Sequence, residues 1–462
     1  MKKIITILAA LLTAAGAAAQ NPTAYFMEGS LFRQQFNPAF APLRGYVNLP
    51  LAGNINVNVG TDLSLDKIFY PHDGKLVTLL DSSVSPDRAL QGIKEKNLIG
   101  FELRENIIGF GKFAKNHKSF WSFDINLRAY EELNLPGQLF EFIKRGQDGS
   151  IRNLGTTTDA YLDAGFAYSF PLCGDKLYFG VKAKFLVGLA RLKLDFEHFD
   201  VTMHDDRWAV ESSATIESNI PGNAGPEYTY DQAGLPYFEI GDIFNIDKFR
   251  PAGYGCAVDL GITYNIVRNL QMSLAVTDLG LIAWSKGGSN CGQAQSRTEY
   301  TGITVENGQT AEAPDFSFEE LMRFRPEEAQ STVRMLRASA NAGLEYWVWR
   351  HHIGIGAFYQ LRLREYKPLH SVTGSLNFSP ARWVTFSGSY TFTGGYGDSV
   401  GVALNLCPNW INFFIGTDML VARHTPMWIP IDRHMMNVTF GLGVPIGKRS
   451  RRVEEFVRVG DR

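Results

Sequence analysis

Residues 435–446 read MMNVTFGLGVPI, and this stretch decides the fold. Successive side chains of a β-strand point to opposite faces, so alternate letters share a face. One face is wholly apolar and carries Met436, Val438, Phe440, Leu442, Val444 and Ile446. The other face carries Asn437, Thr439, Gly441 and Gly443. The alternation predicts a strand with one face in an apolar medium and the other against polar or small neighbours.

The same alternation recurs along most of the chain. We expect about fourteen strands, near 52–60, 98–113, 119–130, 159–170, 176–194, 252–266, 270–278, 338–349, 352–365, 370–378, 383–393, 399–407, 411–420 and 435–446. Many have the length that a tilted transmembrane strand needs, about 9–11 residues. Most joins are short, whereas 131–158, 195–251 and 279–337 are long. Short turns alternating with long loops are typical of outer-membrane barrels, where the loops lie outside the cell.

These features predict an all-β fold, a transmembrane antiparallel β-barrel of about 14 strands with an N-terminal plug and long extracellular loops. The alternative is a soluble β-sandwich or propeller, whose strands also alternate. Two observations favour the barrel: the apolar faces are nearly free of charge at mid-strand, and no repeat of blade length is visible. The chain also has no apolar run of transmembrane-helix length after the first residues.

Charge and composition exclude one class of partner. The 462 residues include 45 Lys or Arg and 47 Asp or Glu, for a formal net charge of −2. A nucleic-acid binder would carry a basic surface, so we expect no nucleic acid as a partner.

The chain begins with a targeting segment at residues 1–19. Met1-Lys2-Lys3 is basic, Ile4 to Ala15 is apolar, and Ala17-Ala18-Ala19 is a cleavage site. An uncleaved anchor is the alternative, but the apolar run is too short for a bilayer of about 30 Å. The sequence therefore predicts export through a cleaved signal peptide to the bacterial outer membrane, with outer-membrane lipid as a partner.

Three further segments follow the signal. Residues 20–51 are dense in Pro and Phe, which predicts an ordered plug or periplasmic segment, with an unstructured leader as the alternative. Residues 52–447 form the predicted barrel, and residues 448–462 a basic C-terminal tail.

The polar faces of the strands carry charges that we expect to face the lumen. They are Asp124, Arg128, Asp163, Lys182, Asp259, Glu345 and Arg362. These charges could line an open lumen or pair with one another to fill it. Buried charges are costly unless they are paired, so we expect them to pair.

Motifs for chemistry are absent from the sequence. It contains no metalloprotease motif, phosphate-binding loop or complete nucleophile elbow, so we expect no enzyme activity, no cofactor and no metal. A loop cluster of His198, His204, Asp205 and Asp206 is the weak metal alternative. The disulfide state of the four cysteines stays open, since three pairings are conceivable among Cys173, Cys256, Cys291 and Cys407.

Several short motifs give the chain a family resemblance. They are Asn37-Pro38-Ala39, Asn106-Ile107-Ile108-Gly109-Phe110-Gly111, Val258-Asp259-Leu260-Gly261 and Asp278-Leu279-Gly280. In this order and spacing the chain resembles the Bacteroidota outer-membrane barrels of domain-of-unknown-function family 5723, which are similar to the FadL-like long-chain fatty-acid transporter superfamily. The resemblance implies a fourteen-strand barrel, an N-terminal plug that begins near Asn37, and apolar substrates. The basic tail departs from the terminal aromatic residue that is common in outer-membrane strands.

The sequence is compatible with two functions. The first is passive uptake or binding of a small hydrophobic molecule by plug and cap residues, for which the candidates are Phe32, Phe36, Asn37, Phe40, Tyr237 and Phe238. The alternative is a scaffold barrel of a surface or secretion assembly that binds a protein partner through loops 195–251 and 279–337.

Overall fold

A computed structural model of the chain describes residues 22–452, with gaps at 62, 64–66, 80, 174–175, 204–206, 221–224, 245–249, 302–304, 307–308, 311–321, 350–351, 419–434, 449 and 451. The predicted signal segment, the loop residues His204, Asp205 and Asp206, and most of the basic tail lie outside the described residues.

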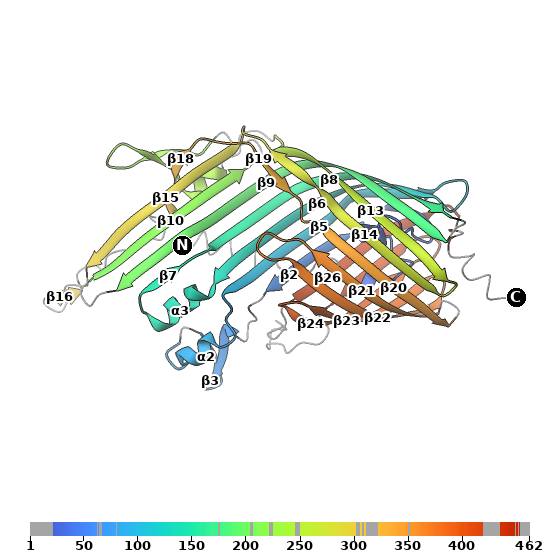
Figure 1. Cartoon of the computed structure of the whole chain (residues 1–462), viewed down its shortest axis with the longest axis horizontal. Coiled ribbons are helices and arrows are strands. Elements are labelled where there is room, and N and C mark those ends of the chain that lie inside the picture. Colours follow the sequence, from blue (N-terminus) through green and yellow to red (C-terminus); the bar gives the residue numbers. More distant parts are fainter. Residues whose placement is uncertain are drawn as a thin grey trace.

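Fourteen antiparallel strands close into a barrel, as the sequence predicts (Figure 1). In order around the wall they are β2 (Ile55–Thr61), β5 (Lys96–Phe113), β6 (Phe120–Pro136), β8 (Leu154–Leu172), β9 (Leu177–Met203), β13 (Gly253–Val267), β14 (Leu270–Trp284), β20 (Ser339–Trp349), β21 (Ile353–Arg362), β22 (Leu369–Ala381), β23 (Val384–Thr393), β24 (Gly397–Leu406), β25 (Asn412–Thr417) and β26 (Met435–Ile446). Closure comes from pairing of β26 with β2, where Ile55 lies opposite Phe440.

The seam of the barrel is shared by two short strands. β2 fills it at one end, and β1 (Gly45–Asn48) fills it at the other, between β26 and β5. The end that holds β1 is also the end of the short turns, such as those after β5 and β8; we call it the short-turn end.

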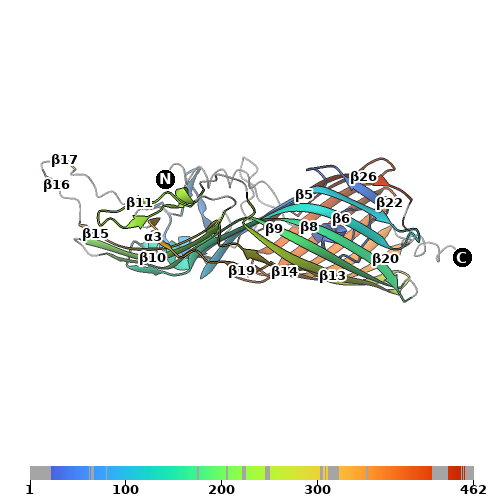
Figure 2. The ribbon, with the colours of Figure 1, turned by 90° about the horizontal axis from the view of Figure 1, so that it is seen from above.

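The opposite end continues as an open sheet that projects beyond the barrel (Figure 2). This extension sheet consists of β10 (Arg207–Asn219), β15 (Ser289–Thr301), β18 (Arg325–Glu327) and the far ends of β8 and β9, with β7 (Gly149–Ile151) beside β9. The prediction that 195–251 and 279–337 are loops is therefore wrong for much of both ranges. Small residues such as Ala214 and Ala294 occupy the apolar face there, and they give a weak alternating signal.

The remaining elements are short. They are β3 (Phe69–His72), β4 (Lys75–Thr78), β11 (Thr229–Tyr230), β12 (Pro236–Tyr237), β16 (Val305–Glu306), β17 (Gln309–Thr310), β19 (Thr332–Met335), α2 (Pro86–Leu90), α3 (Gly137–Arg145) and the 3₁₀ turn η4 (Ile240–Phe244). Gly146 ends α3 with a φ of 61°, a left-handed backbone that favours glycine. None of the helices within the described ranges is long and apolar enough to span a membrane.

The outward face of the barrel strands is apolar and bare of protein. Phe185 and Tyr254 are each 54% exposed, and neighbouring strands present further apolar side chains such as Phe166 and Leu344. The inward face holds small, polar and charged side chains, so the barrel is apolar outside and polar inside.

Candidate functional site

The N-terminal segment, residues 22–44, lies inside the barrel at its short-turn end; we call it the plug. It contains two 3₁₀ turns, η1 (Pro22–Ala24) and η2 (Arg33–Gln35), and most of its residues are buried. η1 contacts β22, β23, β24 and β25. The plug therefore occupies the lumen at this end.

Barrel side chains hold the plug by its backbone. Asn341 Nδ2 donates to the carbonyl oxygen of Phe36 at 2.8 Å, and Asn412 Nδ2 donates to that of Gly29 at 2.9 Å. The hydroxyl of Ser169 donates to the carbonyl oxygen of Ala39 at 2.8 Å. These hydrogen bonds satisfy carbonyl groups that folding buries, which explains why the lumen wall here is rich in Asn and Ser.

Asn37 holds its own turn and the wall together. Its Oδ1 accepts a hydrogen bond from the backbone N–H of Ala39 at 2.8 Å, and its Nδ2 donates to the carbonyl oxygens of Ile262 and Leu274 at 3.1 and 3.3 Å. Asn37 is fully buried. An apolar residue at this position would leave two wall carbonyl groups without this donor.

The three predicted plug phenylalanines lie in two aromatic clusters. Phe36 and Phe40 pack edge-on against Tyr25, with ring centroids 5.5 and 5.2 Å apart. Tyr25 stacks in turn on Phe358 of the wall at 3.9 Å. Phe32 packs separately against Phe414 of β25 at 5.5 Å. All three are buried, so they form the core of the plug and help to pack it against the wall.

Glycines in the wall make room for these rings. A Cβ atom at Gly441 would meet the Phe32 ring, and one at Gly343 would meet Tyr25. A Cβ atom at Gly180 would meet the backbone of Pro38 and Ala39. Sequence reasoning placed Gly441 on the inward face but gave it no role, because a strand glycine alone has several structural explanations.

A second layer of the lumen, beyond the plug, is a buried ionic cluster. Lys184 Nζ lies 2.6 Å from both Asp259 Oδ2 and Asp278 Oδ1. Arg128 pairs with Asp163, and its Nη1 lies 2.8 Å from Asp278 Oδ2. All five side chains are at most 8% exposed. The cluster sets two cations against three carboxylates, and its members lie on the adjacent strands β6, β8, β9, β13 and β14.

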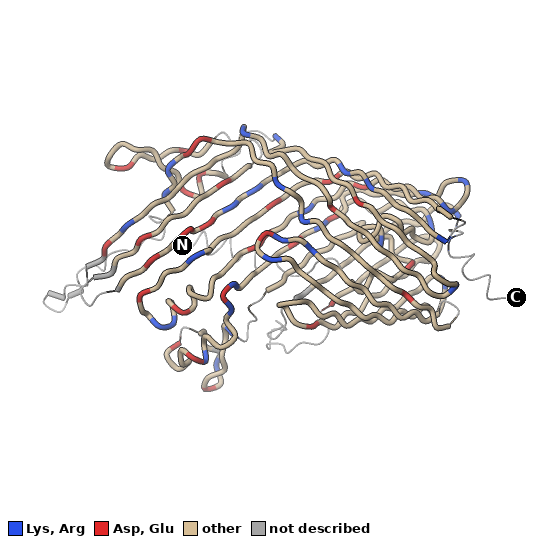
Figure 3. The backbone as a smooth tube through the Cα atoms, viewed as in Figure 1, with Lys and Arg blue, Asp and Glu red and all other residues tan. Residues whose placement is uncertain are grey.

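The other predicted lumen charges divide into paired and unpaired groups. Lys182 Nζ lies 2.6 Å from Asp124 Oδ2, and Arg362 Nη1 lies 2.9 Å from Glu102 Oε2. Glu345 is buried, and its Oε1 has no hydrogen-bond partner in the described part of the chain. Figure 3 shows acidic and basic residues along neighbouring strands of the barrel and of the extension sheet.

Asp278 is a lumen charge that alternation missed. A β-bulge lies between Val258 and Leu260 of the β13–β14 ladder, and Asp278 has a φ of 61°. The bulge shifts the strand by one residue, so counting alternate positions assigns Asp278 to the wrong face. The repeated Asp-Leu-Gly element at 278–280 was the signal that could have identified it.

The predicted cap residues Tyr237 and Phe238 lie far from the plug, over the extension sheet. Phe238 exchanges backbone hydrogen bonds with Phe324 at 2.9 and 3.0 Å. Both rings are buried with Phe196, Ile216 and other apolar residues of that sheet. Tyr237 is half-buried, with Arg323 over its ring at 5.2 Å. These residues cover the extension sheet and do not meet the plug phenylalanines.

A small aromatic pocket lies where strand β14 changes its pairing partner. β14 pairs with β20 up to Thr277 and with β19 from Leu281 onward. The pocket, about 30 Å³, is lined by Tyr130, Asp159, Tyr161, Ile282, Trp284, Arg334, Met335, Leu336 and Arg337. Its aromatic and aliphatic floor fits an apolar group.

Two further features concern possible metal ligands and disulfide partners among the described residues. No group of three or more His, Cys, Asp or Glu residues among the described positions could hold a metal ion. Cys173, Cys256, Cys291 and Cys407 are all free thiols in this structure.

A family described as "Family of unknown function (DUF5723)" matches residues 38–418. No curated protein matches the chain. Among solved structures, the chain is similar to the toluene transporter TbuX of Ralstonia pickettii, with 8% identity, a TM-score of 0.42, and coverage of 94% of this chain and 100% of that one.

Two other solved structures are similar to a comparable degree. One is a Pseudomonas aeruginosa FadL homologue, with 9% identity, a TM-score of 0.41, and coverage of 93% of this chain and 95% of that one. The other is the toluene transporter TodX of Pseudomonas putida, with 10% identity, a TM-score of 0.38, and coverage of 93% and 94%. At such identities none of the three determines what this chain binds.

Proposed function

The chain belongs to the family of unknown function DUF5723, and we propose that it is a plugged outer-membrane barrel that takes up or binds a small hydrophobic molecule. The wall pocket between Tyr161, Trp284 and Leu336 is the observation that carries this proposal.

The outward surface of the barrel supports the membrane location. Large apolar side chains such as Phe185 and Tyr254 remain about half exposed on the closed barrel. A soluble protein rarely exposes so wide an apolar surface, whereas the apolar band of a membrane barrel is covered by lipid.

The interior supports a restricted route for the molecule. The plug fills the short-turn end, and the buried cluster of Arg128, Asp163, Asp278 and Lys184 lines the inner wall beyond it. Buried ion pairs offer no favourable contacts to an apolar molecule. A hydrophobic molecule would therefore bind on the side of this cluster that faces away from the plug. There Tyr161, two residues from Asp163 on β8, lines the wall pocket.

The space inside the pocket is small. A volume of about 30 Å³ holds a methyl group or the edge of a ring, but not a whole ligand. Binding would require residues 334–337 to move. Met335 is 79% exposed, but β19 pairs with β14 and the N–H of Leu336 donates to the carbonyl oxygen of Gly280 at 2.9 Å, so this movement would break part of that pairing.

Uptake by purified protein in liposomes tests the proposal. The assay measures entry of an apolar fluorescent probe with wild-type protein, with Leu336→Asp and with Val333→Asp. Leu336 lines the pocket, whereas Val333 is 62% exposed and does not line it. We expect loss of uptake with Leu336→Asp alone; wild-type protein without uptake, or equal loss in both variants, would contradict the proposal.

A second candidate function, binding of a protein partner, has its own observation. The extension sheet continues β8 and β9 beyond the barrel, and charged residues occur along its strands (Figure 3). A simple pore does not need such a sheet. Cross-linking on intact cells tests this candidate, and the absence of any reproducible protein adduct on residues 191–219 and 289–301 would count against it.

A further inference from the structure

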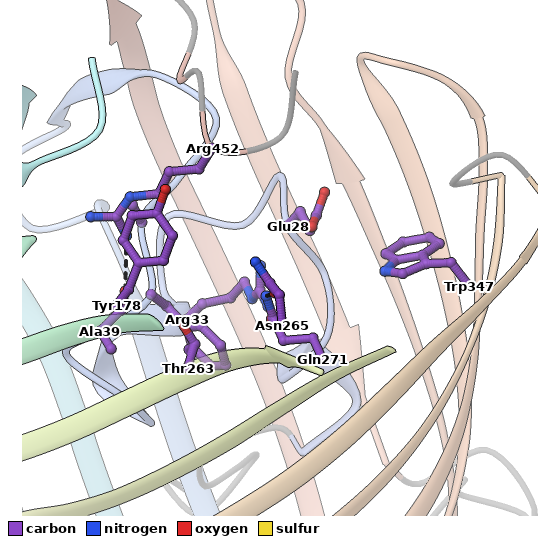
Figure 4. A pocket seen from close by; sticks show the side chains of 11 residues that line it. Glu28, Arg33, Ala39, Tyr178, Thr263, Asn265, Gln271, Trp347 and Arg452 are labelled. Carbon is purple, nitrogen blue, oxygen red and sulfur yellow. Dashed lines mark hydrogen bonds between the residues drawn. The ribbon is translucent and has the colours of Figure 1, made fainter. Parts of the chain in front are cut away.

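Arg452 follows the last barrel strand and reaches back to the plug (Figure 4). Its Nη1 donates to the carbonyl oxygen of Ala39 at 2.9 Å. Its Nη2 donates to the carbonyl oxygen of Ser169 at 3.1 Å and to the Ser169 hydroxyl at 3.0 Å. Its Nε donates to the carbonyl oxygen of Lys118. All three guanidinium nitrogens are therefore engaged.

One side chain thus joins four parts of the molecule. Ala39 belongs to the plug, Lys118 to the turn after β5, Ser169 to β8, and Tyr178 to β9. The guanidinium also lies over the Tyr178 ring, 4.0 Å from its centroid. A planar group with several fixed donors suits such a junction, and a lysine could not make these contacts at once.

A backbone contact of the same segment reinforces the attachment. The N–H of Ser450 donates to the carbonyl oxygen of Leu43 at 2.8 Å. The chain after β26 is therefore bound to the plug at Leu43 and again at Ala39.

Arg452 also completes a pocket beside the plug. The pocket, about 60 Å³, is lined by plug residues including Glu28, Arg33 and Phe40 and by wall residues including Gln271 and Trp347 (Figure 4). Tyr178 and Arg452 form part of the same lining. If Arg452 moved away, this side of the plug would open to the short-turn end.

We propose that Arg452 is a latch that, together with Ser450, holds the plug in its closed position. The proposal rests on the plug function proposed above. Asn341, Asn412 and Ser169 hold the plug from strands of the closed ladder. Arg452 lies outside that ladder and can leave without breaking a strand pair, so its contacts are the ones suited to reversible release.

Hydrogen exchange of the full-length protein in nanodiscs tests the latch. It compares wild-type protein with Arg452→Ala, Arg452→Lys and Lys448→Ala, and follows the peptide that covers residues 22–44. Lys448 is an exposed cation in the same segment, so its variant controls for the loss of charge. Because hydrogen bonds from a charged group are strong, we expect about tenfold faster exchange with Arg452→Ala, a smaller rise with Arg452→Lys, and no change with Lys448→Ala.

Two readouts separate the latch from the uptake function. The heat-dependent gel shift reports whether the barrel is intact, and probe entry into liposomes reports passage. Faster plug exchange in Arg452→Ala, together with no probe entry in wild-type protein, would leave the latch standing and contradict uptake. Equal plug exchange in Arg452→Ala and Lys448→Ala would overturn the latch.

If Arg452→Ala loses the gel shift, Arg452→Gln replaces it in the same comparison. Glutamine keeps one donor group and much of the side-chain length. Exchange equal to that of wild type in that variant would also overturn the latch.

Discussion

Residues 177–188 and 191–203 belong to one strand, β9, but their outward apolar side chains are covered in different ways. Phe185 pairs with Ala164 and Phe196 with Leu154, and both partners lie on the outward face of β8. Phe185 is 54% exposed, whereas Phe196 is 4% exposed beneath Phe238 and Phe324. An apolar face that needs protein cover in one half and has none in the other indicates where a bilayer supplies the cover.

The polar face of the same sheet differs in a parallel way. In the barrel, Lys184 and its two aspartate partners are at most 8% exposed. On the extension sheet, Arg297 lies 3.7 Å from Glu299, with side chains 70% and 49% exposed. The barrel pairs are shielded from water and the extension pair is not, so an ion pair in the barrel has the larger effect on stability.

Lys184→Ala tests this difference with the largest expected effect. Removing one member of a buried ionic cluster leaves uncompensated carboxylates, at a cost of about 3–5 kcal/mol in unfolding free energy. Arg297→Ala on the extension sheet should cost about 0–1 kcal/mol. Denaturant unfolding of the refolded barrel measures both variants, and similar losses would show that the two environments do not differ.

Phe324→Ala tests the protein cover of the extension sheet. The ring is fully buried, and loss of a buried phenylalanine costs about 3–5 kcal/mol. The expected result is rapid proteolysis within the extension sheet, while the heat-dependent gel shift of the barrel is kept. Phe244→Ala is the control, because Phe244 is 54% exposed. Loss of the gel shift would mean that barrel and extension fold as one unit.

Phe185→Arg tests the lipid cover of the barrel. A cation on the lipid face costs about 2–4 kcal/mol near the bilayer midplane. Phe185→Leu keeps an apolar side chain and should cost much less. Equilibrium unfolding from phospholipid vesicles measures both variants. If the arginine variant is as stable as the leucine variant, residue 185 does not face lipid.

The sequence predicted the barrel because lipid imposes a strong pattern on it. The apolar face of Met435–Ile446 is continuous, so alternation identified both the strand and its orientation. Alternation did not identify the extension strands. Protein covers their apolar face, so small residues such as Ala214 and Ala294 are enough to pack against that cover, and they give a weak apolar signal.

The candidate site was predictable only in part, for two physical reasons. Dense Pro and Phe identified the plug segment. The space for its rings, however, comes from wall glycines on strands distant in the sequence, and only the folded structure shows which glycines these are. Asp278 was missed because a bulge breaks the two-residue period, and Arg452 because its contacts join the two ends of the chain. Alternation describes single strands and cannot report such long-range contacts.

Asp231 offers the smallest and most local test of the extension cover. Its Oδ2 accepts a hydrogen bond from Arg325 at 2.6 Å, and its Oδ1 accepts the backbone N–H of Ala233 and Leu235, each at 2.9 Å. These bonds, that of Arg325 foremost, hold the pKa of the Asp231 carboxyl below its ordinary value.

A lowered folded-state pKa sets the sign of the pH dependence. The carboxylate stabilises the turn between β11 and β12 above the ordinary pKa of about 3.9, and that contribution is lost as the pH falls through the lowered value. The expected result is a fall in the exchange protection of the Asp231 and Leu235 amides on acidification, after correction for intrinsic rates. Asp231→Asn keeps an acceptor for both backbone amides but cannot titrate, so its protection should not change over this range. A parallel fall in both proteins would assign the acid sensitivity to another group.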